Sequence, residues 1–208
     1  MNYTEIEKID LCEKCFKKLE NTNVYEIVEK LNKNFWLISI SNYKNLMIRN
    51  LIHILKYKNK TSSINILNIL ITKRIKKNNI NFKDWIIIPI PIHKRKERVR
   101  GFNQSKLIAK ELQKIIIKNK GLDKSPIIST NNLIRTKNTK SQVKLENIEE
   151  RRRNIKNSFK VINYETIKNK NIILVDDVFT TGSTMKEAVK ILRKNGANKI
   201  LGFVIAKT

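Results

Sequence analysis

One stretch of the chain, residues 171–184 (NIILVDDVFTTGST), restricts the possible folds more than any other. Its apolar run at 172–175 is typical of a strand that is buried on both faces of a parallel sheet. Residues 185–192 place apolar side chains at helical spacing, so a helix follows the loop. Backbone N–H groups and the positive end of the helix dipole attract phosphate at such a junction. The stretch therefore predicts an α/β fold with an anion site where this strand ends.

Candidate ligand-binding side chains form two sets within this stretch. The acidic pair, Asp176 and Asp177, follows the apolar run, and carboxylates there suit sugar hydroxyls or Mg²⁺. The phosphate loop comes next and consists of Thr180, Thr181, Gly182, Ser183 and Thr184. The stretch lacks the pattern GxxxxGK[ST] of NTP-hydrolysing P-loops. The simpler alternative is that the carboxylates only end a strand and that Thr181 or Ser183 caps a helix. The order of acids, hydroxyls and glycine between a strand and a helix favours the ligand site.

The net charge of the chain points to a polyanionic partner. Its 44 basic and 18 acidic residues give a formal charge of +26, which is extreme for an enzyme of small metabolites. Such a charge favours nucleic acid. Coding bias toward Lys, Asn and Ile is the alternative explanation, but it does not account for the low number of Glu residues. The sequence shows neither a membrane-spanning run nor a signal peptide, which predicts a cytoplasmic protein.

Hydrophobic periodicity predicts the elements around this stretch. Strands are expected at 35–40, 85–90, 126–134 and 199–206, and helices at 43–58, 62–77 and about 105–120. A loop dense in cations, residues 93–104, follows the strand that Pro89 and Pro91 close. Such a loop at the carboxyl end of a parallel strand is where α/β sheets bind anions. Residues 135–155 are cationic and lack an apolar face, which predicts a mobile hood over the site.

Two cysteines near the start, Cys12 and Cys15, form a CxxC pair. In a cytoplasmic protein this is usually half of a zinc site or a redox pair, and the βαβ context of a redox pair is absent. A structural zinc site needs two further ligands. The chain has no other cysteine, and its two histidines are far away in sequence. The pair is therefore interpreted as a half zinc site, so Zn²⁺ binding is doubtful.

Together these motifs resemble the ComF family, the competence-protein-F branch of type I phosphoribosyltransferase-like proteins. The resemblance runs from about residue 35 to the end of the chain. It is carried by residues 51–58 (LIHILKYK), 88–91 (IPIP), 98–104 (RVRGFNQ), 135 with 139 and 142, 150–155 (ERRRNI), and 175–184 (VDDVFTTGST). It implies a phosphoribosyltransferase-like domain at 35–208, with a parallel sheet flanked by helices.

The resemblance also implies that residues 1–34 are a small cysteine-containing appendage, a degenerate form of the family's four-cysteine zinc module. Only the later cysteine pair of that module is present. Decay of the module, ligands from a second copy of the chain, and an upstream start are the alternatives.

Roles for individual residues follow from the resemblance. The acidic pair would bind the ribose hydroxyls of phosphoribosyl pyrophosphate (PRPP), which enters with Mg²⁺, and the phosphate loop would hold its 5′-phosphate. Five arginines would face pyrophosphate or a DNA backbone: Arg98, Arg100, Arg135, Arg151 and Arg152. Phe102 and Tyr57 offer faces on which bases could stack. No catalytic residue is assigned.

Two functions of different classes are consistent with these residues. The favoured one is a protein of DNA uptake during natural transformation, which binds PRPP or another 5′-phosphate together with single-stranded DNA. Its partners would be a DNA-uptake helicase or other competence proteins. The alternative is an active phosphoribosyltransferase of nucleotide metabolism, which transfers ribose 5-phosphate from PRPP to a nitrogen nucleophile. Whether turnover occurs is left open.

Overall fold

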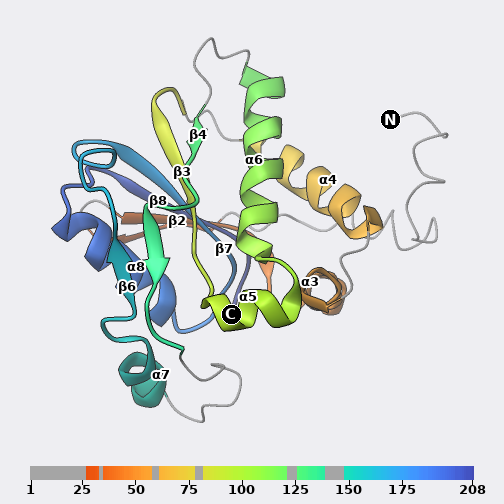
Figure 1. Ribbon diagram of the computed structural model, residues 1–208. Coiled ribbons are helices and arrows are strands. Elements are labelled where there is room, and N and C mark those ends of the chain that lie inside the picture. The colour runs from red at the N-terminus through yellow and green to blue at the C-terminus, as the bar shows by residue number, and fades with distance from the viewer. Residues whose placement is uncertain (1–26, 33–34, 58–60, 78–81, 121–125, 139–147) are drawn as a thin grey trace, which may run out of the picture.

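The computed structural model describes residues 27–32, 35–57, 61–77, 82–120, 126–138 and 148–208 (Figure 1). The strands are β1 (Ile27–Asn32), β2 (Phe35–Asn42), β3 (Trp85–Pro89), β4 (Ile127–Ile128), β5 (Leu133–Arg135), β6 (Phe159–Val161), β7 (Asn171–Phe179) and β8 (Ile200–Lys207). The helices are α3 (Leu46–Tyr57), α4 (Thr61–Lys77), α5 (Lys94–Arg100), α6 (Gln104–Lys120), α7 (Ile148–Ile155) and α8 (Ser183–Lys194).

A six-stranded sheet in the order β1-β2-β8-β7-β3-β4 forms the centre of the described structure. The pairs from β2 to β4 are all parallel, and only β1 is antiparallel to its neighbour. The strand predicted at 172–175 is β7, and these four residues are buried. They are apolar because helices cover both faces of this part of the sheet. The predicted α/β class with a mostly parallel sheet is confirmed.

Two hydrophobic cores lie on the two faces of the sheet. Ile173 and Val175 of β7 point into the core that α3, α4 and α6 cover, whereas Ile172 and Leu174 point into the core that α8 covers. Figure 1 shows α3, α4 and α6 on one side of the sheet, and α8 with β5 and β6 on the other. Because successive side chains of a strand point to opposite faces, the continuous apolar run of β7 serves both cores.

The prediction of a loop throughout residues 93–104 is wrong, because α5 occupies Lys94–Arg100. His93 caps its start, with Nδ1 accepting the Arg95 N–H at 3.2 Å, and Gly101 ends it with a φ of 79°. None of the residues of α5 is buried. A short helix that buries no apolar side chain leaves no apolar periodicity in the sequence, which explains the missed helix.

The prediction of one strand at 126–134 is also wrong. Its first part is β4, which pairs with β3, and its last part is β5, which pairs antiparallel with β6 in a separate two-stranded sheet. Ile127 is 69% exposed at the edge of the main sheet, while Leu133 is buried. The polar residues 129–132 (STNN) separate the two short apolar segments, and such a cluster is typical of a loop, so the prediction of one continuous strand overlooked this break.

The ends of the predicted domains fall partly outside the described residues. Cys12 and Cys15 lie outside the residues that the structure describes. Residues 139–147 of the predicted hood lie outside them as well. The end of the hood is α7, where Ile155 packs into the core beside α8. Upstream of the predicted boundary at residue 35, β1 joins the main sheet. Within the described residues, no helix has both the length and the apolar character needed to cross a membrane.

Candidate functional site

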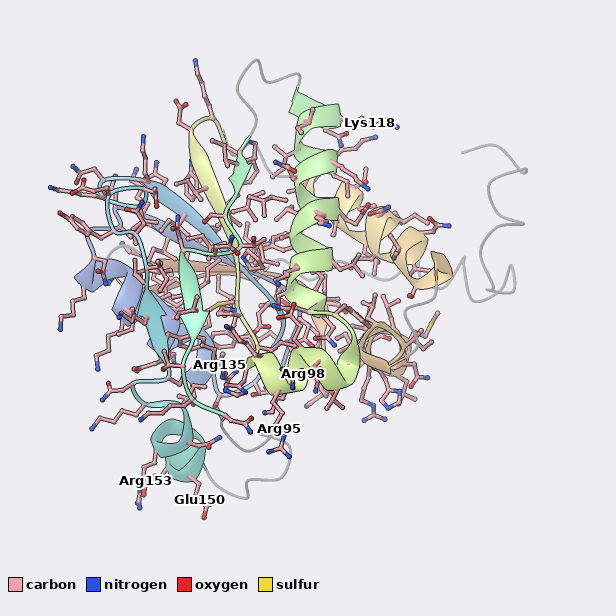
Figure 2. The ribbon with its side chains drawn as sticks, viewed as in Figure 1. Arg95, Arg98, Lys118, Arg135, Glu150 and Arg153 are labelled. Carbon is pink, nitrogen blue, oxygen red and sulfur yellow. The ribbon has the colours of Figure 1, made fainter. Side chains whose placement is uncertain are left out.

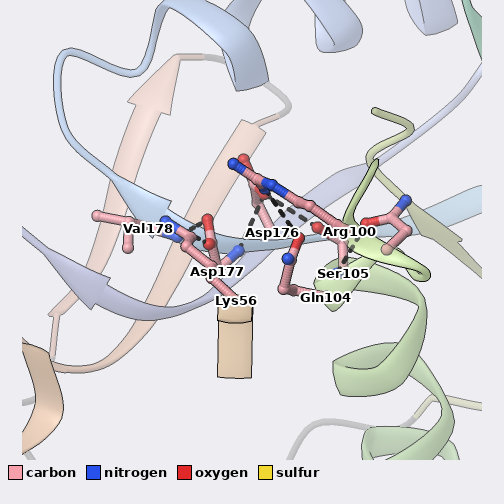
Figure 3. Close-up of polar contacts among 8 residues, drawn as sticks. Lys56, Arg100, Gln104, Ser105, Asp176, Asp177 and Val178 are labelled. Atoms are coloured by element: carbon pink, nitrogen blue, oxygen red, sulfur yellow. Dashed lines mark hydrogen bonds and ion pairs between the residues drawn. The ribbon is translucent and has the colours of Figure 1, made fainter. Parts of the chain in front are cut away.

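The candidate site lies where β7 approaches its carboxyl end. The backbone N–H of Ile90, just past β3, donates to the carbonyl of Val175 at 2.8 Å, so the end of β3 lies beside the part of β7 that carries the acidic pair. The C-terminal turn of α3 and the first turn of α6 meet the acidic pair here, as Figure 3 shows for Lys56, Gln104 and Ser105. Residues that are distant in sequence therefore share one end of the sheet.

Asp176 is held in a fixed orientation. Its Oδ1 accepts the Ser105 hydroxyl at 3.0 Å and the Asp177 backbone N–H at 2.9 Å. Burial, followed by the charge of Asp177, raises the pKa of Asp176 to about 7, although these hydrogen bonds and Lys56 act in the opposite direction. A carboxyl group with this pKa exchanges its proton near neutral pH, so it can accept or donate a hydrogen bond to a ligand hydroxyl.

Asp177 forms an ion pair with Lys56, the basic residue of the last turn of α3. Lys56 Nζ lies 2.8 Å from Asp177 Oδ2, and Asp177 Oδ1 accepts the Val178 N–H at 2.8 Å. Burial, the largest single influence, acts to lower the pKa of Lys56. The charge of Asp177, its hydrogen bond to Lys56 and the charges of Asp176 and Tyr43 together outweigh burial, so the pKa is raised and the ammonium stays charged. Sequence reasoning missed this role. The only signal was the segment LKYK within the resemblance.

Two further buried side chains at the start of α6, Asn103 just before it and Gln104 as its first residue, were not assigned by sequence reasoning. Asn103 Nδ2 donates to the Ile90 carbonyl at 3.0 Å, and its Oδ1 accepts the Ser105 N–H at 3.0 Å. Gln104 is only 3% exposed, and its Oε1 accepts from Arg100 at 3.4 Å. Its Nε2 is buried without a hydrogen-bond partner among the described residues. Since such an N–H group costs about 1–3 kcal/mol when unpaired, it is suited to a ligand or a water.

The phosphate loop has the geometry of an anion site. Gly182 is the N-cap residue of α8 and has a φ of 72°, and a Cβ atom there would lie 2.2 Å from the ring of Phe179. The hydroxyls of Thr181 and Ser183 lie 2.8 Å apart, while the Ser183 N–H reaches Thr181 Oγ1 only at 3.4 Å. No side chain caps the helix at Gly182. A small open pocket lies at this loop, and its lining includes Asp176, Thr180, Gly182, Ser183 and Thr184.

Three cations gather beside the acidic pair, and we call Lys96, Arg100 and Arg135 the cationic cluster. Burial, and then the charges of Arg135 and Arg100, lower the pKa of Lys96. Burial also lowers the pKa of Arg135, and the charge of Asp176 opposes this. The guanidinium of Arg135 lies 5.5 Å from the centre of the Phe159 ring. Mutual repulsion between neighbouring cations favours an anionic ligand between them.

The other predicted residues have different places. Arg98 is exposed on α5, and Phe102 is half-buried in the turn before α6. Figure 2 shows Arg95, Arg98, Arg135 and Arg153 on the same side of the molecule, around α5 and α7. The side chains of Arg151, Arg152 and Tyr57 lie outside the described part of the structure.

The residues present do not fit a metal site built by the protein. Asp177 already contacts an ammonium, and one oxygen of Asp176 has two donors. The described residues contain no group of three or more His, Cys, Asp or Glu side chains that could hold a metal ion. Mg²⁺ needs six oxygen ligands and is commonly bound through substrate phosphates. A Mg²⁺ ion at this site would therefore need most of its oxygen ligands from a bound ligand.

Comparison with known proteins gives the family. Residues 108–207 match the family model described as phosphoribosyl transferase domain, a range that holds the acidic pair and the phosphate loop. Competence protein F of Haemophilus influenzae is 36% identical over 123 residues, which are 58% of this chain and 49% of that protein. Competence protein ComFC of Bacillus subtilis is 30% identical over 128 residues, 61% of this chain and 46% of that protein. The chain is a phosphoribosyltransferase-like protein of the ComF family.

A third relative has a different name. DNA utilization protein YhgH of Escherichia coli O157:H7 is 30% identical over 162 residues, 76% of this chain and 66% of that protein. The chain spans between about half and two thirds of the length of these ComF-family relatives. The family predicted from the sequence motifs is confirmed.

Proposed function

We propose that the protein binds a phosphoribosyl ligand and that PRPP is the ligand whose parts match the site best. The acidic pair suits the ribose hydroxyls, the phosphate loop suits the 5′-phosphate, and the cationic cluster suits the diphosphate. All three lie together where β7 ends, the end at which α/β sheets bind ligands. This juxtaposition is the observation that carries the proposal.

The biological role that we propose is DNA uptake during competence. Two relatives carry the name competence protein and a third is called a DNA utilization protein. In this role the protein would act in the cytoplasm with a DNA-uptake helicase or other competence proteins.

Single-stranded DNA is the polyanion that we propose as a partner. The net charge is +26, and α5 presents the exposed residues Arg95 and Arg98 next to the site. A row of cations follows a phosphate backbone, and aromatic faces such as that of Phe102 stack on bases without sequence preference. Because α5 also provides Arg100 of the cationic cluster, the proposed DNA surface and the ligand site share one helix.

An active phosphoribosyltransferase is the second candidate, and the cationic cluster favours it. In such a reaction the bond from the anomeric carbon to the diphosphate oxygen breaks. A bond from a nitrogen nucleophile to the same carbon forms, and the nitrogen loses its proton. Lys96, Arg100 and Arg135 would stabilise the charge of the departing diphosphate, so catalysis would consist mainly of positioning and electrostatics.

Direct titration of the full chain distinguishes these possibilities. We expect saturable binding of PRPP–Mg²⁺ in calorimetry and binding of a single-stranded oligonucleotide in a parallel fluorescence titration. If PRPP–Mg²⁺ does not bind at millimolar concentration, the proposed ligand is wrong. Release of pyrophosphate from bound PRPP when nitrogen bases are supplied would support the enzyme.

A further inference from the structure

Lys56 brings a positive charge to the acidic pair from a part of the chain far from the phosphate loop. Its Nζ lies 2.8 Å from Asp177 Oδ2, and the two side chains are only 24% and 16% exposed. Screening by salt and water is weak for a pair that is mostly buried. Because Asp177 Oδ1 also accepts the Val178 N–H, both oxygens of Asp177 already have a donor. Asp177 is thus neutralised and oriented before any ligand arrives.

The rest of the site is also supplied with positive charge. Figure 3 shows both Lys56 and Arg100 beside the acidic pair. The charge of Asp176 acts on both Lys56 and Arg135. Two adjacent carboxylates without such neighbours would repel each other and attract a divalent cation. Here cationic side chains already supply that neutralisation.

We infer that Lys56 is the resident counter-ion of the acidic pair, an inference that rests on the proposed function. It makes recognition of the ribose 5-phosphate part of the ligand independent of a divalent cation. In this arrangement Lys56 is a positioning residue: its ammonium holds the Asp177 carboxylate in place through the 2.8 Å ion pair. Mg²⁺ then affects only the diphosphate end of PRPP. A ligand without a diphosphate, ribose 5-phosphate, would bind equally well with and without Mg²⁺.

Ribose 5-phosphate is therefore the probe for the test, in calorimetric titrations with Mg²⁺ and with EDTA. The wild-type Kd should agree within about twofold between the two conditions. Lys56→Met should weaken binding about tenfold or more in EDTA, because Asp177 loses its charged donor, and Mg²⁺ should restore part of the affinity. Lys56→Arg, which keeps the charge, should lose less. Lys110→Met, at an exposed position of α6, is the matched control and should behave as the wild type.

Each outcome decides the inference. Loss of wild-type affinity by about tenfold in EDTA would overturn it, and so would a Lys56→Met variant that binds as the wild type without Mg²⁺. The wild-type comparison stands by itself if Lys56→Met fails to fold. If the wild type binds PRPP–Mg²⁺ but not ribose 5-phosphate, the inference is wrong while the proposed function stands. If it binds neither, both fail.

Discussion

At the scale of single residues, Asp176 couples the site to pH. Its pKa is raised to about 7, whereas an Asp in an unfolded chain titrates near 3.9. Between these values the folded protein holds a proton that the unfolded chain releases. The contribution of Asp176 to stability is therefore fully present below about pH 4 and is lost as pH rises through about 7.

The first prediction follows from this sign. The free energy of unfolding of the wild type, measured relative to Asp176→Asn, should fall between pH 5 and 7 by on the order of 1 kcal/mol per pH unit. Above pH 8 it should be level. Urea unfolding of both proteins across this range checks it. A difference that stays level from pH 5 upward would contradict this, because it would show that Asp176 is already ionised in the folded protein throughout the range.

Gly182 allows a second prediction, with a control in the same chain. Alanine at Gly182 meets both a positive φ and the ring of Phe179, which lies 2.2 Å from the ideal Cβ position. Gly101 has a φ of 79° but nothing within 4 Å of its Cβ position. In both alanine variants the free energy of unfolding should fall by about 1 kcal/mol, because alanine is strained at a positive φ. Only Gly182→Ala should also bind inorganic phosphate about tenfold or more weakly. Its new methyl group would clash with the Phe179 ring, and relieving that clash would shift the phosphate loop.

Titration of phosphate into both variants, with thermal unfolding measured alongside, provides the comparison. Equal phosphate affinity in the two would mean that the loop at Gly182 does not form the anion site.

At the scale of elements, α5 is the proposed contact to DNA. Its exposed residues Arg95 and Arg98 lie on the side of the molecule that carries the site, whereas Lys118 lies at the far end of α6 (Figure 2). The third prediction is that Arg95→Ala with Arg98→Ala lowers the magnitude of the salt slope for single-stranded DNA by up to about 1.4, at about 0.7 per phosphate contact. Lys110→Ala with Lys118→Ala removes the same charge and should leave the slope nearly unchanged.

Fluorescence titrations between low and moderate salt measure both slopes. Similar small changes in both double variants would favour coding bias as the origin of the lysines, and the ligand site would then stand without the DNA contact.

The elements also show what the sequence could and could not predict. β7, the phosphate loop and α8 were predictable, because their apolar spacing and loop residues are contiguous in the sequence. α5 was missed because its residues form no apolar face. The two strands β4 and β5 were merged although the polar residues 129–132 separate them. Lys56 and Gln104 were missed for another reason. Their roles depend on contacts between α3, α6 and β7, which local sequence does not indicate.

At the scale of the whole molecule, the cysteine pair gives a fourth prediction. Cys12 and Cys15 are the only cysteines, and four ligands make a structural zinc site. Elemental analysis of the purified chain should therefore find clearly less than one zinc ion per monomer. One tightly bound zinc per chain in a protein shown to be monomeric would contradict this. In a dimer, the same result would indicate ligands shared between two copies.

The central claim for the whole molecule is that a phosphoribosyl ligand binds at the acidic pair. Calorimetric titration of PRPP–Mg²⁺ into Asp176→Asn with Asp177→Asn tests it most directly, with circular dichroism to verify the fold. The matched control is Asp84→Asn. Asp84 is exposed and has a φ of 61°, a backbone conformation that Asn also tolerates. We expect the double variant to bind more than about tenfold more weakly than the wild type and the control to bind normally, since each charge-assisted hydrogen bond contributes about 1.5–3 kcal/mol. Unchanged affinity in a folded double variant would contradict the account.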